Sequence, residues 1–226
     1  KVFFFLVLVC CCFCVELKTA VPSPQVNLCP TCVKLMEESI EEILNIIGNG
    51  VIVGGCEILC SLLPSAWEQI ACDLICDYVG IEEFIKIVDD VDPEPLTICM
   101  DLGVCPINDY GYAFLTYLAV SPKIGHIGTE FHILAQFQVV NHTGTGSLEA
   151  VVIPPEGFPF GGSVLLDDLA PGPYSETFSF RAEPNSEDPF PPGTYQVICE
   201  ICEGPCGSKH KHSKIWDRNT TTFQIE

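Results

Sequence analysis

Two kinds of hydrophobic periodicity divide the chain into two regions. Between Cys29 and Cys105, apolar residues recur at helical spacing among acidic residues. After Tyr110, β-branched and aromatic residues alternate with polar ones and are interrupted by Pro and Gly, a pattern typical of short strands. The sequence therefore predicts a helical region and a β region, with a boundary near residues 106–109.

Local start and stop signals predict four or five short helices in the first region, the last of which is either a turn or a short helix. Gly48 and Gly50 end the first segment, and Pro64 ends the second. Ser65 stands three residues before Glu68, the spacing of a capping box, so a third helix is expected to begin there. The expected segments cover residues 33–47, 51–63, 65–80, 81–88 and 99–105.

The pattern after Tyr110 predicts several short strands. Apolar residues alternate with polar or smaller neighbours from Phe131 to Val139, and the "NHTGTGS" that follows is a turn signal. Strands spaced in this way favour an immunoglobulin-like β-sandwich over residues 110–226, in which Tyr195 of "PPGTYQVICE" would brace a strand corner. Further strands are expected at 148–153, 174–180, 194–202 and 221–225.

The first residues are typical of a secretory signal peptide. Lys1 precedes an apolar run from Val2 to Val15, which is too short to span a membrane and is followed by polar residues and two prolines. We expect the signal peptide over residues 1–20, incomplete at its N-terminus because no initiator Met precedes it. The predicted location is extracellular, with the endolysosomal lumen as the alternative.

The charge of the chain limits its partners. The formal net charge is −20, and residues 29–105 hold 15 acids against only two lysines. Neither region offers a positive field for phosphate, so nucleic acid is excluded as a partner. Anionic bilayers should repel the chain at neutral pH, so contact with lipid or membrane is expected only at acidic pH, where carboxylates lose their charge.

Cysteine spacing predicts two disulfides in the middle of the helical region. Cys56 and Cys60 lie four residues apart on the second segment, and Cys72 and Cys76 lie four apart on the third. If the "SLLP" link folds these segments into an antiparallel hairpin, Cys60 opposes Cys72 and Cys56 opposes Cys76. Four cysteines leave with the signal peptide, and the remaining 11 are an odd number, so one thiol is unpaired or bonded to another chain.

The helical region resembles the saposin-like (saposin B-type) proteins. The resemblance rests on a CxxC that opens a helix, "LCSLLPSAWEQIAC" in the middle and a closing "CMDLGVC", and it defines a domain over residues 27–106. The expected fold class is therefore α + β with two domains, a disulfide-stapled saposin-like helical leaf followed by an immunoglobulin-like β-sandwich. Cys56 and Cys76 depart from the six-cysteine pattern of that family. The resemblance implies the disulfides Cys29–Cys105, Cys32–Cys99 and Cys60–Cys72.

The segment "CEICEGPCGSKHKHSKIW" could hold either a metal ion or a disulfide. It contains Cys199, Cys202, Cys206, His210 and His212, which are soft ligands at close spacing. An oxidising compartment favours the disulfide, since oxidation removes the thiolates that zinc needs. We expect Cys199 to pair with Cys206 and leave Cys202, one of three possible choices, and we expect no metal or cofactor.

The chain carries two sequons and lacks the sequence motifs of common catalytic sites. Asn141 and Asn219 head N-x-T sequons in polar stretches and are predicted glycosylation sites. No G-x-S-x-G, phosphate loop or H-E-x-x-H is present, so the chain is not expected to be an enzyme.

The order of these parts resembles the countin family of secreted cell-counting factor subunits from social amoebae. The shared features are a signal peptide, an acidic cysteine-rich helical region, and a β region with "NHTG" and a late Cys/His-rich loop. The resemblance implies a non-enzymatic extracellular factor that acts in a large complex with other subunits, through an unidentified cell-surface receptor, and limits group size. The alternative is a lipid-binding or pore-forming protein of the amoebapore kind. A secreted hydrolase ranks third because it lacks a visible nucleophile or metal site.

Overall fold

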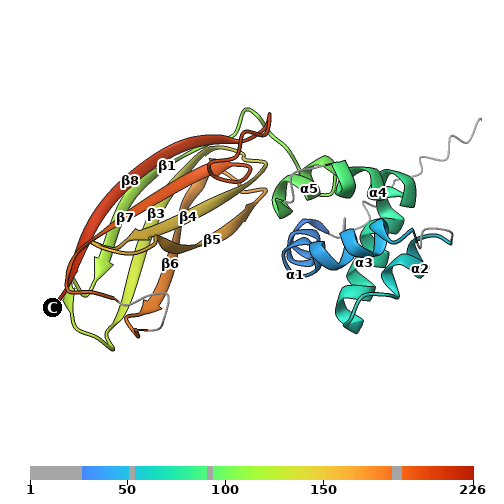
Figure 1. Ribbon diagram of the computed structural model, residues 1–226. Coiled ribbons are helices and arrows are strands. Elements are labelled where there is room, and N and C mark those ends of the chain that lie inside the picture. The colour runs from blue at the N-terminus through green and yellow to red at the C-terminus, as the bar shows by residue number, and fades with distance from the viewer. Residues whose placement is uncertain (1–26, 51–53, 91–93, 185–189) are drawn as a thin grey trace, which may run out of the picture.

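The computed structural model describes residues 27–50, 54–90, 94–184 and 190–226. The predicted signal peptide and its four cysteines lie outside these residues. Figure 1 shows a group of helices at one end of the molecule and two curled sheets at the other. The helices of the described residues are α1 (Cys29–Gly48), α2 (Cys56–Cys60), α3 (Ala66–Val79), α4 (Ile81–Asp90) and α5 (Pro95–Asp101).

The ends of the helices follow local sequence signals. A proline stands in the first turn of α1, where no intrahelical hydrogen bond is lost. The capping box of α3 is confirmed: Ser65 Oγ accepts a hydrogen bond from the backbone N–H of Glu68 at 3.2 Å, and the Glu68 carboxylate accepts one from the Ser65 N–H at 2.8 Å. Helix α2 begins only at Cys56 because Gly55 has φ 100°, a conformation that cannot extend a helix. Residues 51–53 of the predicted segment lie outside the described residues.

Disulfides hold the helices together around one core. Two of them, Cys56–Cys76 and Cys60–Cys72, join α2 to α3. Two others, Cys29–Cys105 and Cys32–Cys99, join the start of α1 to the end of the helical region. These are the partners implied by the helical geometry and by the saposin-like resemblance. All eight of these cysteines are buried in a single apolar cluster with residues of every described helix.

The strands of the described residues form two sheets in the β region. One sheet has the order β1-β3-β6 and the other has the order β2-β8-β7-β4-β5, with antiparallel neighbours except for β2 and β8. Alternate residues of β3, β4, β7 and β8 point inward and fill two apolar clusters between the sheets. The strands are β1 (Tyr112–Ser121), β2 (Ile124–Gly125), β3 (Glu130–Asn141), β4 (Thr145–Ile153), β5 (Phe160–Asp167), β6 (Gly172–Arg181), β7 (Gly193–Glu203) and β8 (Lys214–Ile225).

The predicted fold class is wrong. Strand predominates over helix in the described residues, at 40% against 29%, and the sheets are curled. A saposin-like helical leaf is not shown: the other helices, of 5 to 14 residues, pack around the 20-residue α1 in one closed core. The sequence pattern overestimated the helical part, because the second apolar segment forms a helix of only five residues, whereas β1, β3, β6, β7 and β8 each have ten residues or more.

Within the described part of the chain, no helix is both long and apolar enough to cross a membrane.

Candidate functional site

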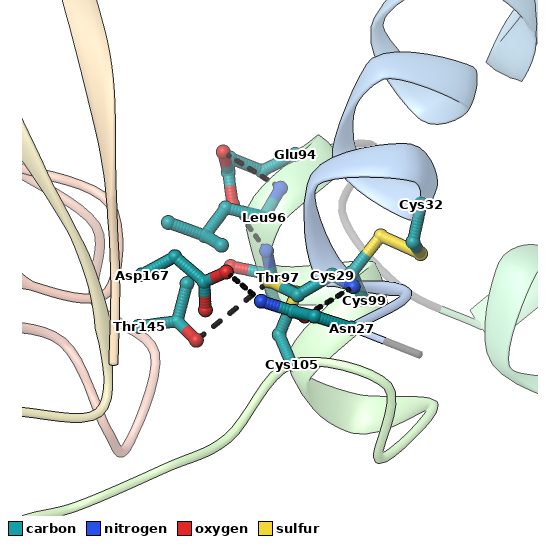
Figure 2. The surroundings of a disulfide bond; sticks show 10 residues. All are labelled: Asn27, Cys29, Cys32, Glu94, Leu96, Thr97, Cys99, Cys105, Thr145 and Asp167. Atoms are coloured by element: carbon teal, nitrogen blue, oxygen red, sulfur yellow. Dashed lines mark hydrogen bonds between the residues drawn. A yellow bond between two sulfur atoms is a disulfide. The ribbon is translucent and has the colours of Figure 1, made fainter. Parts of the chain in front are cut away.

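The helical region and the β region meet at a polar junction. On the helical side, the junction consists of the start of α1, helix α5 and the linker of residues 106–111. On the β side, it consists of the start of β4, the ends of β5 and β7, and the β7–β8 loop. Figure 2 shows its first contacts, where Asn27 Nδ2 donates a hydrogen bond to Asp167 Oδ2 of β5. The sulfur of Cys29 lies 3.7 Å from Thr145 Oγ1 of β4. Because Cys29 is bonded to Cys105, both ends of the helical region are fixed at this point.

A carboxylate positions α5 beside the same contacts. Glu94 precedes the helix and accepts hydrogen bonds from the backbone N–H groups of Leu96 at 3.2 Å and Thr97 at 2.6 Å. These donors lie in the first turn and have no carbonyl partner within the helix. The cap fixes the start of a seven-residue helix, which in turn carries Cys99 to its partner Cys32.

The centre of the junction is the buried side chain of Glu203 at the end of β7. Only 2% of this residue is exposed, and its Oε1 accepts a hydrogen bond from the backbone N–H of Asn108 at 3.2 Å. Its Oε2 has no hydrogen-bond partner among the described residues. Burial, with a smaller contribution from the charge of Asp109, raises the pKa of Glu203 to about 7, while hydrogen bonds from the N–H groups of Asn108 and Gly144 oppose the shift.

Two glycines leave the space that this carboxyl group occupies. A Cβ at Gly111 would lie 2.9 Å from Glu203 Oε2, and one at Gly144 would overlap both Glu203 Oε1 and the backbone nitrogen of Asn108. The backbone of the linker therefore packs directly against the backbone of the β region. Its carbonyl at Pro106 also accepts a hydrogen bond from the N–H of Thr145 at 2.7 Å.

The histidines of the β7–β8 loop contact acids on the helical side and the linker. His210 Nε2 lies 3.2 Å from Asp101 Oδ2 at the end of α5, and His212 Nδ1 lies 2.8 Å from Asp109 Oδ1. Both histidine side chains are largely buried. The loop therefore packs on the helical region and on the linker through these two histidines.

The predicted disulfide Cys199–Cys206 is wrong. The structure joins Cys202 to Cys206 and leaves Cys199 as a free, buried cysteine. The alternation of β7 explains the choice: Cys199 points with Ile201 into the core between the sheets, whereas Cys202 lies where Cys206 and Glu200 come close to it. Burial, followed by the charges of Glu200 and Glu149, raises the pKa of the Cys199 thiol to about 12.

One group of side chains in the described residues has the spacing of metal ligands. The ligand atoms of Glu200, Cys202 and Cys206 lie within 4.8 Å of one another. With Cys202 and Cys206 bonded to each other, neither sulfur can act as a thiolate, which is the form that binds zinc. The donor set of this structure therefore does not fit a zinc site.

The two predicted glycosylation sites lie at exposed positions. Asn141 ends β3, and its Nδ2 donates a hydrogen bond to the carbonyl of Tyr110 at 3.2 Å. Asn219 is an exposed residue within β8. Glycosylation at these two residues stays a prediction.

Sequence reasoning missed the acid at the centre of the junction. The alternation of β7 does indicate that Glu203 points inward. Every second residue from Tyr195 onward lies on the inward face of the strand, namely Tyr195, Val197, Cys199, Ile201 and Glu203. Asn27 and Asp167 gave no such signal, because 140 residues separate them in the sequence.

These features define a disulfide-rich protein of two regions, in which a small stapled helical core is joined to two packed sheets through a polar junction. Two family descriptions match the same two parts of the chain. The countin N-terminal domain matches residues 27–103, and the countin C-terminal domain matches residues 113–226. The chain therefore belongs to the countin family.

Relatives from Dictyostelium discoideum match most of the chain. Countin-1 is 40% identical over 198 residues, which are 87% of this chain and 77% of the relative. Countin-3 is 39% identical over 87% of this chain and 89% of its own length, and Countin-2 is 42% identical over 82% and 74%. Among solved structures, the C-terminal domain of wzt aligns with 54% of this chain and 81% of its own length, but a TM-score of 0.38 and 10% identity are too low to support an argument.

Proposed function

We propose that the chain is a secreted, non-enzymatic signalling subunit of an extracellular complex that regulates the size of cell groups. The observation that carries this proposal is the countin match, which covers both the helical and the β region. The five disulfides among the described cysteines support secretion, because such bonds persist in oxidising compartments. The strongly acidic composition supports a protein that stays away from anionic membranes and nucleic acid.

The surroundings of the histidines support a non-enzymatic role. His132 Nδ1 lies 2.8 Å from Ser179 Oγ, but the two are cross-strand neighbours on an exposed sheet face, and His132 has no acid partner among the described residues. His210 and His212 have acid partners, Asp101 and Asp109, but neither ring contacts a hydroxyl or thiol in the described part of the chain. A hydrolytic centre needs nucleophile, base and orienting acid together.

The proposal is tested by expressing the tagged chain in Dictyostelium discoideum and sizing the protein in conditioned medium by non-reducing gel filtration. We expect it in the medium, within an assembly much larger than one 24.7 kDa chain, and we expect a change in group size when its level is raised. The same fractions are then tested for leakage of liposomes at neutral and acidic pH. Retention inside cells, or a small species that empties liposomes at acidic pH, would contradict the proposal.

A further inference from the structure

Helix α3 carries a row of large apolar side chains on its outer face. Trp67, Ile70, Leu74 and Tyr78 are three or four residues apart and are between 36% and 69% exposed. We call these four residues the α3 stripe. The buried face of the same helix consists of Ala71, Cys72, Ile75 and Cys76, so the residues of the stripe are not part of the core.

The size of the α3 stripe indicates an interaction surface. Its exposed fractions together equal about two whole large side chains, or roughly 400 Å² at about 200 Å² each. The largest apolar patch on a soluble monomeric protein is typically of this size and often has a binding function. From Trp67 to Tyr78 the stripe extends about 16 Å along the helix axis, which is roughly three helical turns.

Unpaired carboxylates lie beside the stripe. Asp73 and Asp77 immediately precede Leu74 and Tyr78 on α3. Burial of Asp73, followed by the charges of Asp77 and of Glu57 on α2, raises the pKa of Asp73. No lysine, arginine or histidine of the described residues forms an ion pair with these three acids, which we call the acidic edge. A ligand of the stripe therefore meets negative charge along one side.

We propose that the α3 stripe binds a basic amphipathic helix of a protein partner. Apolar residues at positions i, i+3 or i+4, and i+7 of such a helix would pack on the stripe, and its lysines or arginines would pair with the acidic edge. Trp and Tyr, which stand at the two ends of the stripe, are among the residue types that most often dominate the binding energy of interfaces.

Charge favours a basic helix over the two other candidate partners of an apolar face, which are a second copy of the chain and a bilayer. A second copy of the chain brings a net charge of −20 and another acidic edge, so like charges would oppose each other. Helices that lie on bilayers carry lysine and arginine beside the apolar face, whereas α3 carries aspartates there, which lipid phosphates repel. One cation, Lys34, lies 4.3 Å from the ring of Trp67 and covers only that end of the stripe.

The test uses the purified full chain and two synthetic helical peptides of about 18 residues, long enough to cover the stripe. Both peptides have the same leucine face, but one carries lysine and arginine on its flanks and the other carries glutamate. Binding is followed by the emission of Trp67, since the second tryptophan, Trp216, is already buried. We expect the basic peptide to bind and to shift the Trp67 emission to shorter wavelength, and we expect no binding of the acidic peptide.

Amino-acid substitutions test whether the basic peptide binds at the α3 stripe. Ile70→Asn should weaken binding of the basic peptide at least about tenfold, because it places a polar group in the middle of the apolar contact. The joint substitution of Asp73→Asn and Asp77→Asn should weaken binding by roughly two- to tenfold and reduce its salt dependence. Ile127→Asn is the matched control, since Ile127 is 52% exposed in the β region, and it should leave binding unchanged.

Several results would overturn the proposal. These are equal binding of both peptides, full binding by the Ile70→Asn variant, or an equal loss with Ile127→Asn. A stripe-dependent shift of Trp67 emission on neutral phosphatidylcholine vesicles, without peptide binding, would assign the surface to lipid instead. Circular dichroism checks the fold of each variant, and Tyr78→Ser replaces Ile70→Asn if that variant does not fold. The peptide test uses the purified chain alone, whereas the test of the proposed function looks for an assembly in the medium. A negative result in one test therefore does not decide the other.

Discussion

Glu203 should lower the free energy of unfolding as the pH rises, and the substitution Glu203→Gln should remove this pH dependence. Its pKa is about 7 in the folded protein, against an ordinary value of 4.5. Between these two pH values, the folded state keeps a proton that the unfolded state has already released. The contribution of Glu203 to stability is therefore fully present below pH 4.5 and is lost as the pH rises through 7.

The size of this effect follows from the shift in pKa. At about 1.36 kcal/mol for each pKa unit, the rise from 4.5 to about 7 corresponds to roughly 3 kcal/mol of folding stability. Glu203→Gln keeps the shape of the side chain and an oxygen that accepts the hydrogen bond from Asn108, but it carries no charge. The variant should match the wild-type protein at about pH 4 and exceed its stability by up to roughly 3 kcal/mol at about pH 8.

The assay is equilibrium unfolding in urea at a series of pH values from about 4 to about 8, with the disulfides intact and tryptophan fluorescence as the signal. The difference between the variant and the wild-type protein isolates Glu203 from the other carboxylates, whose titration is common to both. Glu156→Gln is the control, because Glu156 is exposed and should show no such difference. The same stability difference at both ends of the pH range would refute the reasoning. A variant less stable than the wild-type protein at the alkaline end would show that the wild-type carboxylate is ionised and well paired.

Three further predictions concern the junction and its surroundings. Gly144→Ala should lower the free energy of unfolding by roughly 2 to 3 kcal/mol in urea titrations, because its Cβ would overlap the backbone nitrogen of Asn108, and an unchanged midpoint would contradict this. Cys199 should resist iodoacetamide at about pH 8 in the native protein and react only after unfolding, as read by mass spectrometry, since burial raises the pKa of its thiol to about 12. Replacing Cys202 and Cys206 by serine should cost about 2 kcal/mol, against about 4.5 kcal/mol for Cys29 and Cys105, because chain entropy scales with loops of 4 and 76 residues. Equal losses for the two disulfides would show that loop length does not set their contributions.

Local signals in the sequence predicted much of the secondary structure. The capping box at Ser65 and Glu68 and the alternation from Phe131 to Val139 each depend on residues a few positions apart, and each is present in the structure. The hydroxyl of Tyr195 also braces a corner, donating a hydrogen bond to the carbonyl of Pro191 at 2.9 Å. Such features need no knowledge of distant contacts.

Features that depend on distant contacts were missed or mistaken. Asp101 and His210 meet across 109 residues, and no periodicity in either segment indicates the other. The choice among Cys199, Cys202 and Cys206 depended on which face of β7 points into the core, and spacing alone left three answers open. The fold class failed for a related reason, since the lengths of α2 and of the strands were set by backbone geometry and by the curled sheets.

The disulfides explain how the helical region carries an apolar surface without losing its fold. A small helical domain normally needs its large apolar side chains in the core, because little other burial is available. Here α2 and α3 are joined by two disulfides, each of which contributes about 2 to 4 kcal/mol by restricting the unfolded chain. Trp67, Ile70 and Tyr78 are therefore not required for the stability of the core and remain on the outer face of α3, where they are available to a partner.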